Sequence, residues 1–342
     1  MTGPAPPLLA VEDLRVEFPT DDGPLVAVDG LTVDVADHEV LGLVGESGAG
    51  KTVAALAVLG LLPRRARVSG SARWRGQELL GRPERDLQPL RGEELAIVFQ
   101  DALAALNPVM TVGAQIAEAI AVHHPAGGAA AQGRVVELLD LVGIPDPATR
   151  AGQYPHEFSG GMRQRAMLAM ALANDPALLI ADEPTTALDV TLQAQVLDVL
   201  ERVRDRTGTA ILLITHDLGV VAGLADRVVV LYAGRAVEDA PVDALFAAPR
   251  HPYTLGLLAS LPRVDRPARR GALYRIPGQP PSLLDRPAGC PFHPRCEFAE
   301  LPDPCATRCP DPVAVGDRHR SACHRTEALA GVTPDQLAAR SG

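Results

Sequence analysis

The sequence predicts an α/β fold built around a parallel β-sheet, and three observations indicate it. A strand-like run, "EVLGLVG" (39–45), leads into a glycine-rich loop and then into the helical run "TVAALAVLGLL" (52–62). The stretch "ALLIADEP" (177–184) is apolar until it ends in two acids, which is typical of a buried parallel strand. Strand-like and helix-like segments alternate along most of the chain, as they do in proteins with parallel sheets. With 342 residues, 47% of them hydrophobic, the chain can form two domains or one domain with an appendage.

The first hundred residues carry mostly strand patterns. Apolar alternation in "LLAVEDLRVEF" (8–18) and "LTVDVADHEVLGLVG" (31–45) predicts strands, and the intervening "PTDDGP" is turn-like. The run "ELAIVFQ" (94–100) predicts a further strand. From about 101 to 175 the pattern becomes helical, so we expect a helical subdomain there.

The second half resumes the alternation of helix and strand. Within "TLQAQVLDVLERVRDRTG" (191–208) the apolar residues share one helical face, and Gly208 is a stop signal. Strands are predicted at 209–217 and 226–237. After about residue 250 prolines become frequent and apolar runs vanish, so we place a boundary near 245–265. The apolar helical face comprises Leu192, Val196, Val199, Leu200 and Val203.

The composition argues against several classes of function. The formal net charge of -10 disfavours a general nucleic-acid binder, and an aromatic content of 3% disfavours a stacking platform for single strands. We expect no signal peptide, because "MTGPAPPLLAVEDL" lacks a positive start and a long apolar core. We also expect no transmembrane helix, because no window offers about 18 uncharged apolar residues. The predicted location is the cytoplasm, or the cytoplasmic face of a membrane reached through a partner.

The octapeptide "GESGAGKT" fits the phosphate-loop pattern G-x-x-x-x-G-K-[ST] and holds the only lysine of the chain. The glycines let backbone N–H groups point at a β-phosphate, and the following helix adds its positive dipole end. We expect Lys51 to reach the β- and γ-phosphates and Thr52 to bind Mg²⁺. The nucleotide-binding set predicted in this segment is Gly45, Glu46, Ser47, Gly48, Ala49, Gly50, Lys51, Thr52 and Val53.

The two acids that end "LLIADE" predict the second half of a nucleotide site. Asp182 falls at the carboxyl end of a predicted strand, where open α/β sheets bind their ligands. There it can hold Mg²⁺, commonly through water. Glu183 follows it and can act as general base on the attacking water.

A third motif, "SGGMRQR" (159–165), places a serine and two glycines at a predicted helix start. There Ser159 and the amides of Gly160 and Gly161 can bind a γ-phosphate. This stretch resembles the signature motif of ATP-binding cassette (ABC) ATPases. The resemblance implies a P-loop ATPase with a parallel-sheet core, an antiparallel β subdomain and a helical subdomain. The order that matches the family is the phosphate loop, Gln100, "SGGMRQR", "LLIADEP", "TALD" (186–189) and His216.

The resemblance implies roles for residues around ATP and Mg²⁺. Phe18 is expected to stack on the adenine ring. Gln100 is expected to sense the γ-phosphate and bind Mg²⁺, and to couple the site to a membrane partner. His216 is expected to contact the γ-phosphate beside Glu183. The predicted catalytic residues are therefore Glu183, His216 and Gln100.

The resemblance also implies that two ATPases sandwich two nucleotides. Ser159 and Gly161 are then expected to touch the ATP held by the opposite ATPase, and Asp189 to lie at the interface. ATP binding closes such a pair, and hydrolysis with product release opens it.

Over roughly residues 8 to 325 the chain is similar to the ATPase subunits of oligopeptide and dipeptide importers. "HPYTLGLLASLP" (251–262) is similar to the motif that heads their C-terminal extension, and "GCPFHPRC" to the cysteine segment that follows. We therefore predict an ABC ATPase domain at 8–255 and an oligopeptide-transporter-type C-terminal domain, small and irregular, at 256–342.

This resemblance implies an ATPase at the cytoplasmic face of the cell membrane that drives peptide uptake. The implied partners are a second related ATPase chain, two transmembrane permease subunits and an extracytoplasmic peptide-binding protein, with no nucleic acid. An importer of nickel or another small solute is the closest alternative. A soluble ABC ATPase acting in DNA repair or on the ribosome is a more distant one.

All five cysteines lie after residue 289, where such a cluster in a reducing compartment more often binds metal than forms disulfides. Cys290, Cys296, Cys305 and Cys323 match the family's four positions in order, and Cys309 is additional. Four thiolates suit tetrahedral zinc or an iron–sulfur cluster, although the lack of a C-x-x-C pair disfavours an ordinary zinc knuckle. The resemblance favours a structural [4Fe–4S] cluster, with zinc and free thiols as alternatives.

Overall fold

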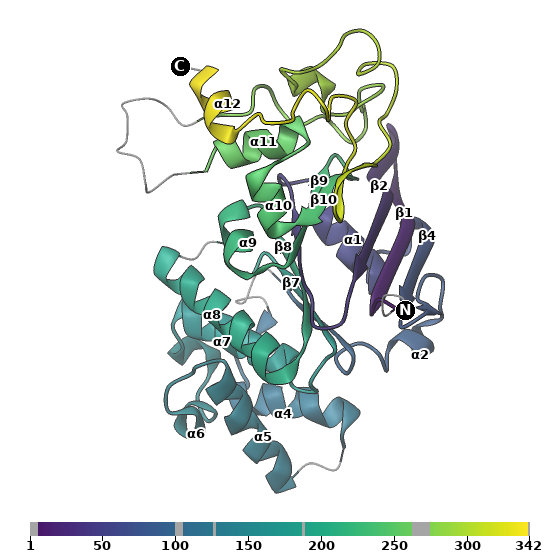
Figure 1. The fold of residues 1–342 in the computed structure, drawn as a ribbon. Coiled ribbons are helices and arrows are strands. Elements are labelled where there is room, and N and C mark those ends of the chain that lie inside the picture. The colour runs from purple at the N-terminus through teal and green to yellow at the C-terminus, as the bar shows by residue number, and fades with distance from the viewer. Residues whose placement is uncertain (1–5, 100–104, 126–127, 187–188, 262–273, 341–342) are drawn as a thin grey trace, which may run out of the picture.

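The computed structural model describes residues 6–99, 105–125, 128–186, 189–261 and 274–340. It contains two β-sheets, with a group of helices below them and a C-terminal region above them in Figure 1. The predicted α/β class, with a parallel core, antiparallel strands and a helical part, is confirmed. Among the described residues, no helix is both long enough and apolar enough to span a membrane.

The larger sheet has eight strands in the order β11-β12-β10-β9-β3-β8-β7-β6. The strands from β9 to β6 in this order are parallel, and the others pair antiparallel. The strands are β3 (Val40–Val44), β6 (Leu95–Val98), β7 (Leu178–Asp182), β8 (Ala210–Thr215), β9 (Arg227–Tyr232), β10 (Arg235–Pro241), β11 (Val313–Gly316) and β12 (His319–Ser321).

The smaller sheet is antiparallel, in the order β2-β1-β4-β5. Its strands are β1 (Leu9–Thr20), β2 (Gly23–Val35), β4 (Arg67–Trp74) and β5 (Gln77–Glu78). The predicted strand segment 31–45 therefore contains parts of two strands from different sheets. The chain leaves β2 through a turn at His38, whose φ is 60°, before it enters β3.

The predicted strand 226–237 is likewise two strands, β9 and β10, paired as a hairpin. Its turn is made by Ala233 and Gly234, whose φ values are 47° and 81°. Positive φ at both central residues is typical of the two-residue turns that join antiparallel strands. A single glycine inside an apolar run was too weak a sequence signal to show this reversal.

The longer helices between the strands lie where the sequence indicates helical periodicity, whereas the short helices at 84–87 and 218–224 fall in segments for which no helix was predicted. The described helices of the predicted helical subdomain, α4 to α7, fall between residues 112 and 171. The helices up to residue 224 are α1 (Lys51–Val58), α2 (Glu84–Leu87), α4 (Val112–His123), α5 (Gly128–Leu141), α6 (Pro147–Arg150), the 3₁₀ turn η1 (Pro155–Glu157), α7 (Gly160–Ala171), α8 (Val190–Thr207) and α9 (Leu218–Leu224).

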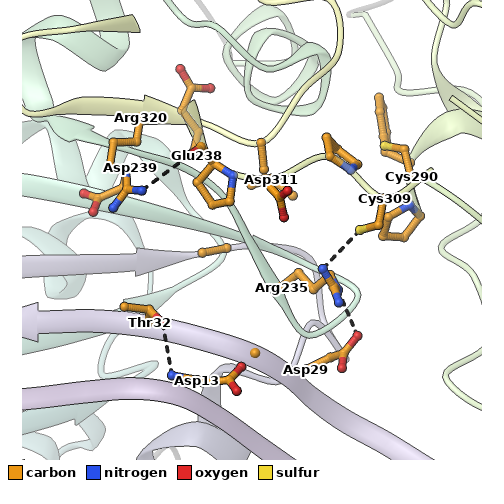
Figure 2. A pocket seen from close by; sticks show the side chains of 18 residues that line it. Asp13, Asp29, Thr32, Arg235, Glu238, Asp239, Cys290, Cys309, Asp311 and Arg320 are labelled. Atoms are coloured by element: carbon orange, nitrogen blue, oxygen red, sulfur yellow. Dashed lines mark hydrogen bonds and ion pairs between the residues drawn. The ribbon is translucent and has the colours of Figure 1, made fainter. Parts of the chain in front are cut away.

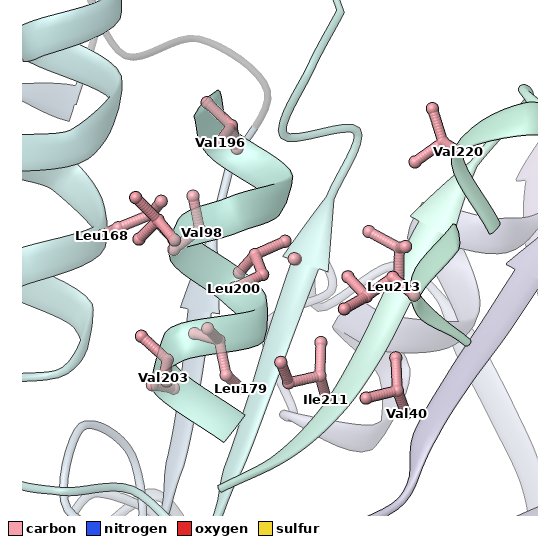
Figure 3. Close-up of a cluster of buried hydrophobic side chains, with 14 of the residues drawn as sticks. Val40, Val98, Leu168, Leu179, Val196, Leu200, Val203, Ile211, Leu213 and Val220 are labelled. Carbon is pink, nitrogen blue, oxygen red and sulfur yellow. The ribbon is translucent and has the colours of Figure 1, made fainter. Parts of the chain in front are cut away.

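The apolar face predicted for 191–208 forms a large part of the core. Figure 3 shows Val196, Leu200 and Val203 of α8 among the side chains of the parallel strands, such as Leu179 and Ile211. Val196, Val199, Leu200 and Val203 of the predicted face are almost completely buried, whereas Leu192 is half-buried. Burying such a side chain stabilises the fold by about 1.5–3 kcal/mol. This packing fixes the ends of β7 and β8, from which the candidate site residues project.

The C-terminal region, defined from here on as residues 242–261 and 274–340, begins with two helices that start before the predicted boundary, and its described residues after them are mostly irregular, as predicted. It contains α10 (Val242–Ala247), α11 (Pro252–Ala259), the 3₁₀ turn η2 (His293–Arg295) and α12 (Pro334–Arg340). Its strand β12 pairs with β10, so this region continues the large sheet. The predicted domain boundary at 255/256 falls inside α11 and stays a prediction.

Candidate functional site

The phosphate loop connects β3 to α1, and glycines shape it. Gly48 and Gly50 have φ values of 79° and 99°, which other residues rarely adopt. A Cβ atom at Gly45 would lie 2.3 Å from the carbonyl oxygen of Leu231, and one at Gly50 would lie 2.4 Å from that of Ala27. The loop is therefore pressed against neighbouring backbone, and larger side chains would displace it.

Lys51 begins α1, and its side chain curls back over this loop. The Nζ atom donates hydrogen bonds to the carbonyl oxygens of Gly45 (2.7 Å) and Glu46 (3.1 Å) and lies 4.0 Å from Glu183 Oε1. Burial lowers the pKa of Lys51, while the nearby carboxylates of Glu183, Asp182 and Glu46 oppose this shift. The ammonium group is thus shielded from solvent, in a position where it can bind a phosphate oxygen.

The two residues predicted to hold Mg²⁺ in the described part of the site lie in direct contact. Thr52 Oγ1 donates a hydrogen bond of 3.0 Å to Asp182 Oδ1 at the end of β7. Burial raises the pKa of Asp182, which is 4% exposed. Hydroxyl and carboxylate oxygens suit Mg²⁺, and a cation here would stabilise the buried carboxylate. The residues present therefore fit the predicted ion.

Glu183 and His216 meet where β7 and β8 end. The Nδ1 atom of His216 lies 3.5 Å from Glu183 Oε1, and Thr186 Oγ1 donates to Glu183 Oε2 at 2.8 Å. The backbone of Glu183 is left-handed, with φ of 48°, a conformation that costs a non-glycine residue of order 1–3 kcal/mol. Neighbouring strand ends thus place a carboxylate and an imidazole beside the lysine of the phosphate loop.

Ser159 and Asp189, which are predicted to meet the opposite ATPase, lie at two helix starts. Ser159 Oγ accepts a hydrogen bond from the Met162 amide at 3.3 Å, and Asp189 Oδ1 accepts one from the Leu192 amide at 2.9 Å. Ser159, Gly160 and Asp189 are exposed. Each start is therefore capped within its own helix and also faces solvent.

Two further predicted residues, Phe18 and Gln100, are not placed in the site by the described structure. Phe18 is half-buried in β1 and packs against the apolar cluster of the smaller sheet, so a packing role accounts for its position. Gln100 lies outside the described residues. The roles predicted for both residues stay predictions.

Two residues that the sequence did not indicate contact the phosphate loop from the C-terminal region. Tyr253 Oη accepts a hydrogen bond of 2.9 Å from the Glu46 amide. The Nη1 and Nη2 atoms of Arg295 donate to the Glu46 carboxylate at 2.7 and 3.0 Å. Both lie in motifs that suggested family membership, "HPYTL" and "HPRC", but no local pattern indicated where their side chains point.

The cysteines are all free thiols. Burial raises the pKa of Cys290 to about 11 and the pKa values of Cys296 and Cys323 to about 12, and neighbouring thiols act in the same direction. Cys305 is buried, and its carbonyl oxygen accepts a hydrogen bond from the Cys290 amide at 2.9 Å. Within the described ranges, no group of three or more His, Cys, Asp or Glu residues is placed to hold a metal ion.

Cys309 is exposed and lines a pocket of about 430 Å³ between β2, β10 and the C-terminal region (Figure 2). Its sulfur accepts a hydrogen bond of 3.0 Å from Arg235 Nη1, and Arg235 Nε donates to Asp29 at 2.8 Å. This additional cysteine therefore belongs to a polar link between the C-terminal region and the smaller sheet.

Comparison with known proteins places the fold in one class. Residues 28–186 match the family described as ABC transporter. A dimeric ATP-binding cassette in a post-hydrolysis state with ADP and phosphate superposes with a TM-score of 0.61, over 68% of this chain and 98% of that one, at 21% identity. The structure of cbiO1 from Clostridium perfringens, part of an ABC transporter complex, gives a TM-score of 0.61, over 71% of this chain and 92% of that one, at 25% identity. The fold is that of an ABC-type ATPase cassette.

The C-terminal region and the relatives narrow the class further. Residues 237–302 match the family described as oligopeptide/dipeptide transporter, C-terminal region. The oligopeptide transport ATP-binding protein OppD of Salmonella typhimurium is 50% identical over 296 residues, which cover 86% of this chain and 88% of that protein. The OppD protein of Mycobacterium tuberculosis is 56% identical over 326 residues, which cover 95% of this chain but 53% of that protein. The chain belongs to the family of oligopeptide and dipeptide transport ATP-binding proteins, and it spans about half the length of its mycobacterial relatives.

Proposed function

We propose that this chain hydrolyses ATP to drive the uptake of oligopeptides or dipeptides, acting at the cytoplasmic face of the cell membrane. The observation that carries the ATPase activity is a pair of adjoining contacts at the end of β7: Thr52 bonds to Asp182, and Glu183, the next residue, lies within ion-pair distance of both Lys51 and His216. The peptide class of substrate is supported by the C-terminal region and by relatives named as oligopeptide transport proteins.

Each residue of the site has a defined task in this proposal. Lys51 turns from the loop carbonyls to the β- and γ-phosphates of ATP. Thr52 and Asp182 hold Mg²⁺, which when bound neutralises charge on the phosphates. Glu183 accepts the proton of the attacking water, and His216 donates towards the γ-phosphate.

We propose that the working unit contains a second, related ATPase chain. Ser159 and Asp189 cap the starts of α7 and α8, and both are exposed, as is Gly160. Within a closed pair, Ser159 and the amide of Gly161 complete the site on the opposite chain. This division of the site explains why one chain alone displays an open serine–glycine turn.

A groove of about 650 Å³ beside the strand that leads to Gln100 is the proposed docking surface for a permease subunit. Its rim exposes three large apolar side chains, Leu61 (41% exposed), Phe99 (44%) and Val122 (68%). Phe99 directly precedes Gln100, so a segment bound here adjoins the residue expected to sense the γ-phosphate. A permease is the occupant that both the family and this adjacency favour.

Val122→Asp is expected to weaken assembly with the permease subunits by about 10-fold or more, because it places a charge in an apolar contact. Co-purification and a titration of the permease complex measure this effect, with ATP affinity as the test of intact folding. Val313→Asp, on the exposed strand β11 and outside the groove, is the matched control. If both variants weaken assembly with the permease subunits equally, the groove is not the docking surface.

We propose further that Cys290, Cys296, Cys305 and Cys323 hold a structural [4Fe–4S] cluster, with Zn²⁺ as the alternative. The proposal rests on the set of four thiols in one small, proline-rich region, where metal binding can supply folding free energy. It requires these side chains to move together on binding, because the described structure does not group three of them as ligands. The cluster would stabilise the C-terminal region and would take no part in ATP binding.

Protein purified without oxygen is expected to contain about four iron and four sulfide per chain. Cys305→Ser is expected to lose most of this metal, whereas Cys309→Ser is expected to keep it, because Cys309 bonds to Arg235. Stoichiometric zinc without iron would identify the alternative ion. Absence of both metals from the wild-type chain, or their full retention in Cys305→Ser, would refute the metal site.

The substrate class is tested on the assembled importer in vesicles. Binding protein loaded with a peptide is expected to stimulate ATP hydrolysis severalfold over unloaded binding protein. Stimulation by nickel-loaded binding protein alone would exclude peptides and support the small-solute alternative.

A further inference from the structure

One residue of the phosphate loop, Glu46, is held from three directions. Its backbone N–H donates to Tyr253 Oη at 2.9 Å, and its carbonyl oxygen accepts from Lys51 Nζ at 3.1 Å. Its carboxylate accepts both hydrogen bonds of the Arg295 fork, at 2.7 and 3.0 Å. Glu46 therefore joins the lysine that is expected to bind phosphate to two side chains of the C-terminal region.

The side chain of Arg295 is held in the orientation that this contact requires. Its side chain is 5% exposed, its Nε atom donates to the Pro277 carbonyl oxygen at 2.9 Å, and its Nη1 atom lies 3.3 Å from Tyr232 Oη. The guanidinium group lies over the rings of Tyr232 and Phe292, at 5.8 and 5.9 Å from their centroids. Little rotamer freedom is left to lose, so the bidentate pair with Glu46 is pre-organised.

Tyr253 is fixed by the same aromatic group. Its ring centroid lies 4.7 Å from that of Tyr232 and 5.4 Å from that of Phe292. Tyr253 is completely buried, so its hydroxyl cannot turn to water as an alternative partner. The loop amide and the tyrosine hydroxyl thus hold each other in place.

We propose that Arg295 and Tyr253 are positioning residues through which the C-terminal region sets the affinity of the phosphate loop for ATP. Arg295 neutralises the carboxylate of Glu46, which otherwise adds negative charge beside the triphosphate. Tyr253 holds the Glu46 amide, and so fixes the backbone that carries the Lys51 contact. The inference rests on the proposed role of this loop as the ATP cradle.

The test compares Arg295→Ala, Glu46→Gln and the double variant in the full chain, with ATP affinity measured at constant Mg²⁺. Arg295→Ala is expected to weaken ATP binding by about 10-fold, because it leaves a partly buried carboxylate unpaired. The double variant is expected to return to within about threefold of wild type, because no unpaired carboxylate remains. In the assembled importer the change is expected in KM for ATP rather than in kcat. A purely structural role for Arg295 predicts no recovery in the double variant, and that result would overturn the proposal.

Three further variants complete the test. Tyr253→Phe preserves the ring packing and is expected to weaken ATP binding about threefold; if Arg295→Ala does not fold, this variant and Arg295→Lys carry the test. Arg286→Ala is the matched control, because Arg286 also joins the C-terminal region to the cassette, but through Asp29 at 2.9 Å. Weakening by Arg286→Ala equal to that by Arg295→Ala would refute a specific action on the loop.

Lys51→Ala separates this inference from the proposed function. If Lys51→Ala abolishes ATP binding while Arg295→Ala and Tyr253→Phe bind as wild type, only the positioning role is refuted. If Lys51→Ala itself binds ATP normally, the loop is not the ATP cradle and both proposals fail.

Discussion

Glu183→Gln is expected to lower the rate of ATP hydrolysis by the assembled importer by about 10²–10⁴-fold, the range that a general base contributes. Glutamine keeps the shape and the hydrogen bond from Thr186 but cannot accept the proton of the attacking water. ATP binding is expected to persist, because Lys51, Thr52 and Asp182 are unchanged. The ATPase pair is then expected to accumulate in its closed, ATP-bound state.

Steady-state hydrolysis and nucleotide retention measure this effect together. Glu201→Gln is the matched control, since Glu201 lies on α8 with its side chain 53% exposed and outside the site. Hydrolysis by Glu183→Gln within a factor of two of wild type would remove Glu183 as the base. A parallel loss in Glu201→Gln would show that the effect is not specific to the site.

Lys51→Ala is expected to weaken ATP binding by about 30-fold or more. The change removes a buried cation that lies beside Glu183 and is expected to bind the phosphates, and loss of one member of a buried charge pair costs about 2–5 kcal/mol. Each 1.4 kcal/mol corresponds to a factor of ten in affinity. Isothermal titration of the full chain with ATP and Mg²⁺ measures the change.

Lys51→Arg separates charge from shape in the same experiment. Lys51 is the only lysine in the sequence, and arginine supplies the positive charge at every other Lys or Arg position. The planar guanidinium cannot follow the path of the Lys51 ammonium between the carbonyls of Gly45 and Glu46. We expect Lys51→Arg also to weaken binding strongly, whereas wild-type affinity in either variant would contradict the cradle.

Much of the site was predictable because its residues lie in short motifs with fixed local structure. A strand, a glycine loop and a helix necessarily place Lys51 and Thr52 at the carboxyl end of β3. The same rule places Asp182 and His216 after neighbouring parallel strands, so their proximity follows from the topology. The contact of Thr52 with Asp182 and that of Glu183 with His216 agree with this reasoning.

The remainder depends on interactions between distant segments that no local pattern encodes. The pairing of β10 with β12 joins Glu238 to Ser321, and the contact of Glu46 with Arg295 spans 249 residues. Side-chain direction in the proline-rich C-terminal region follows from its packing against the cassette, not from periodicity. For this reason the sequence indicated an irregular appendage, whereas the structure shows a region that touches the phosphate loop.

The most direct measurement is a structure of the assembled importer, carrying Glu183→Gln, with ATP and Mg²⁺ bound. We predict that the triphosphate lies against Lys51 of one chain and within hydrogen-bond distance, roughly 3 Å, of the serine–glycine turn of the other. Where both ATPases carry the motif, Ser159 of this chain then contacts the nucleotide of its partner. A triphosphate bound away from Lys51, or Ser159 remote from every terminal phosphate, would contradict the proposed division of the site between two chains.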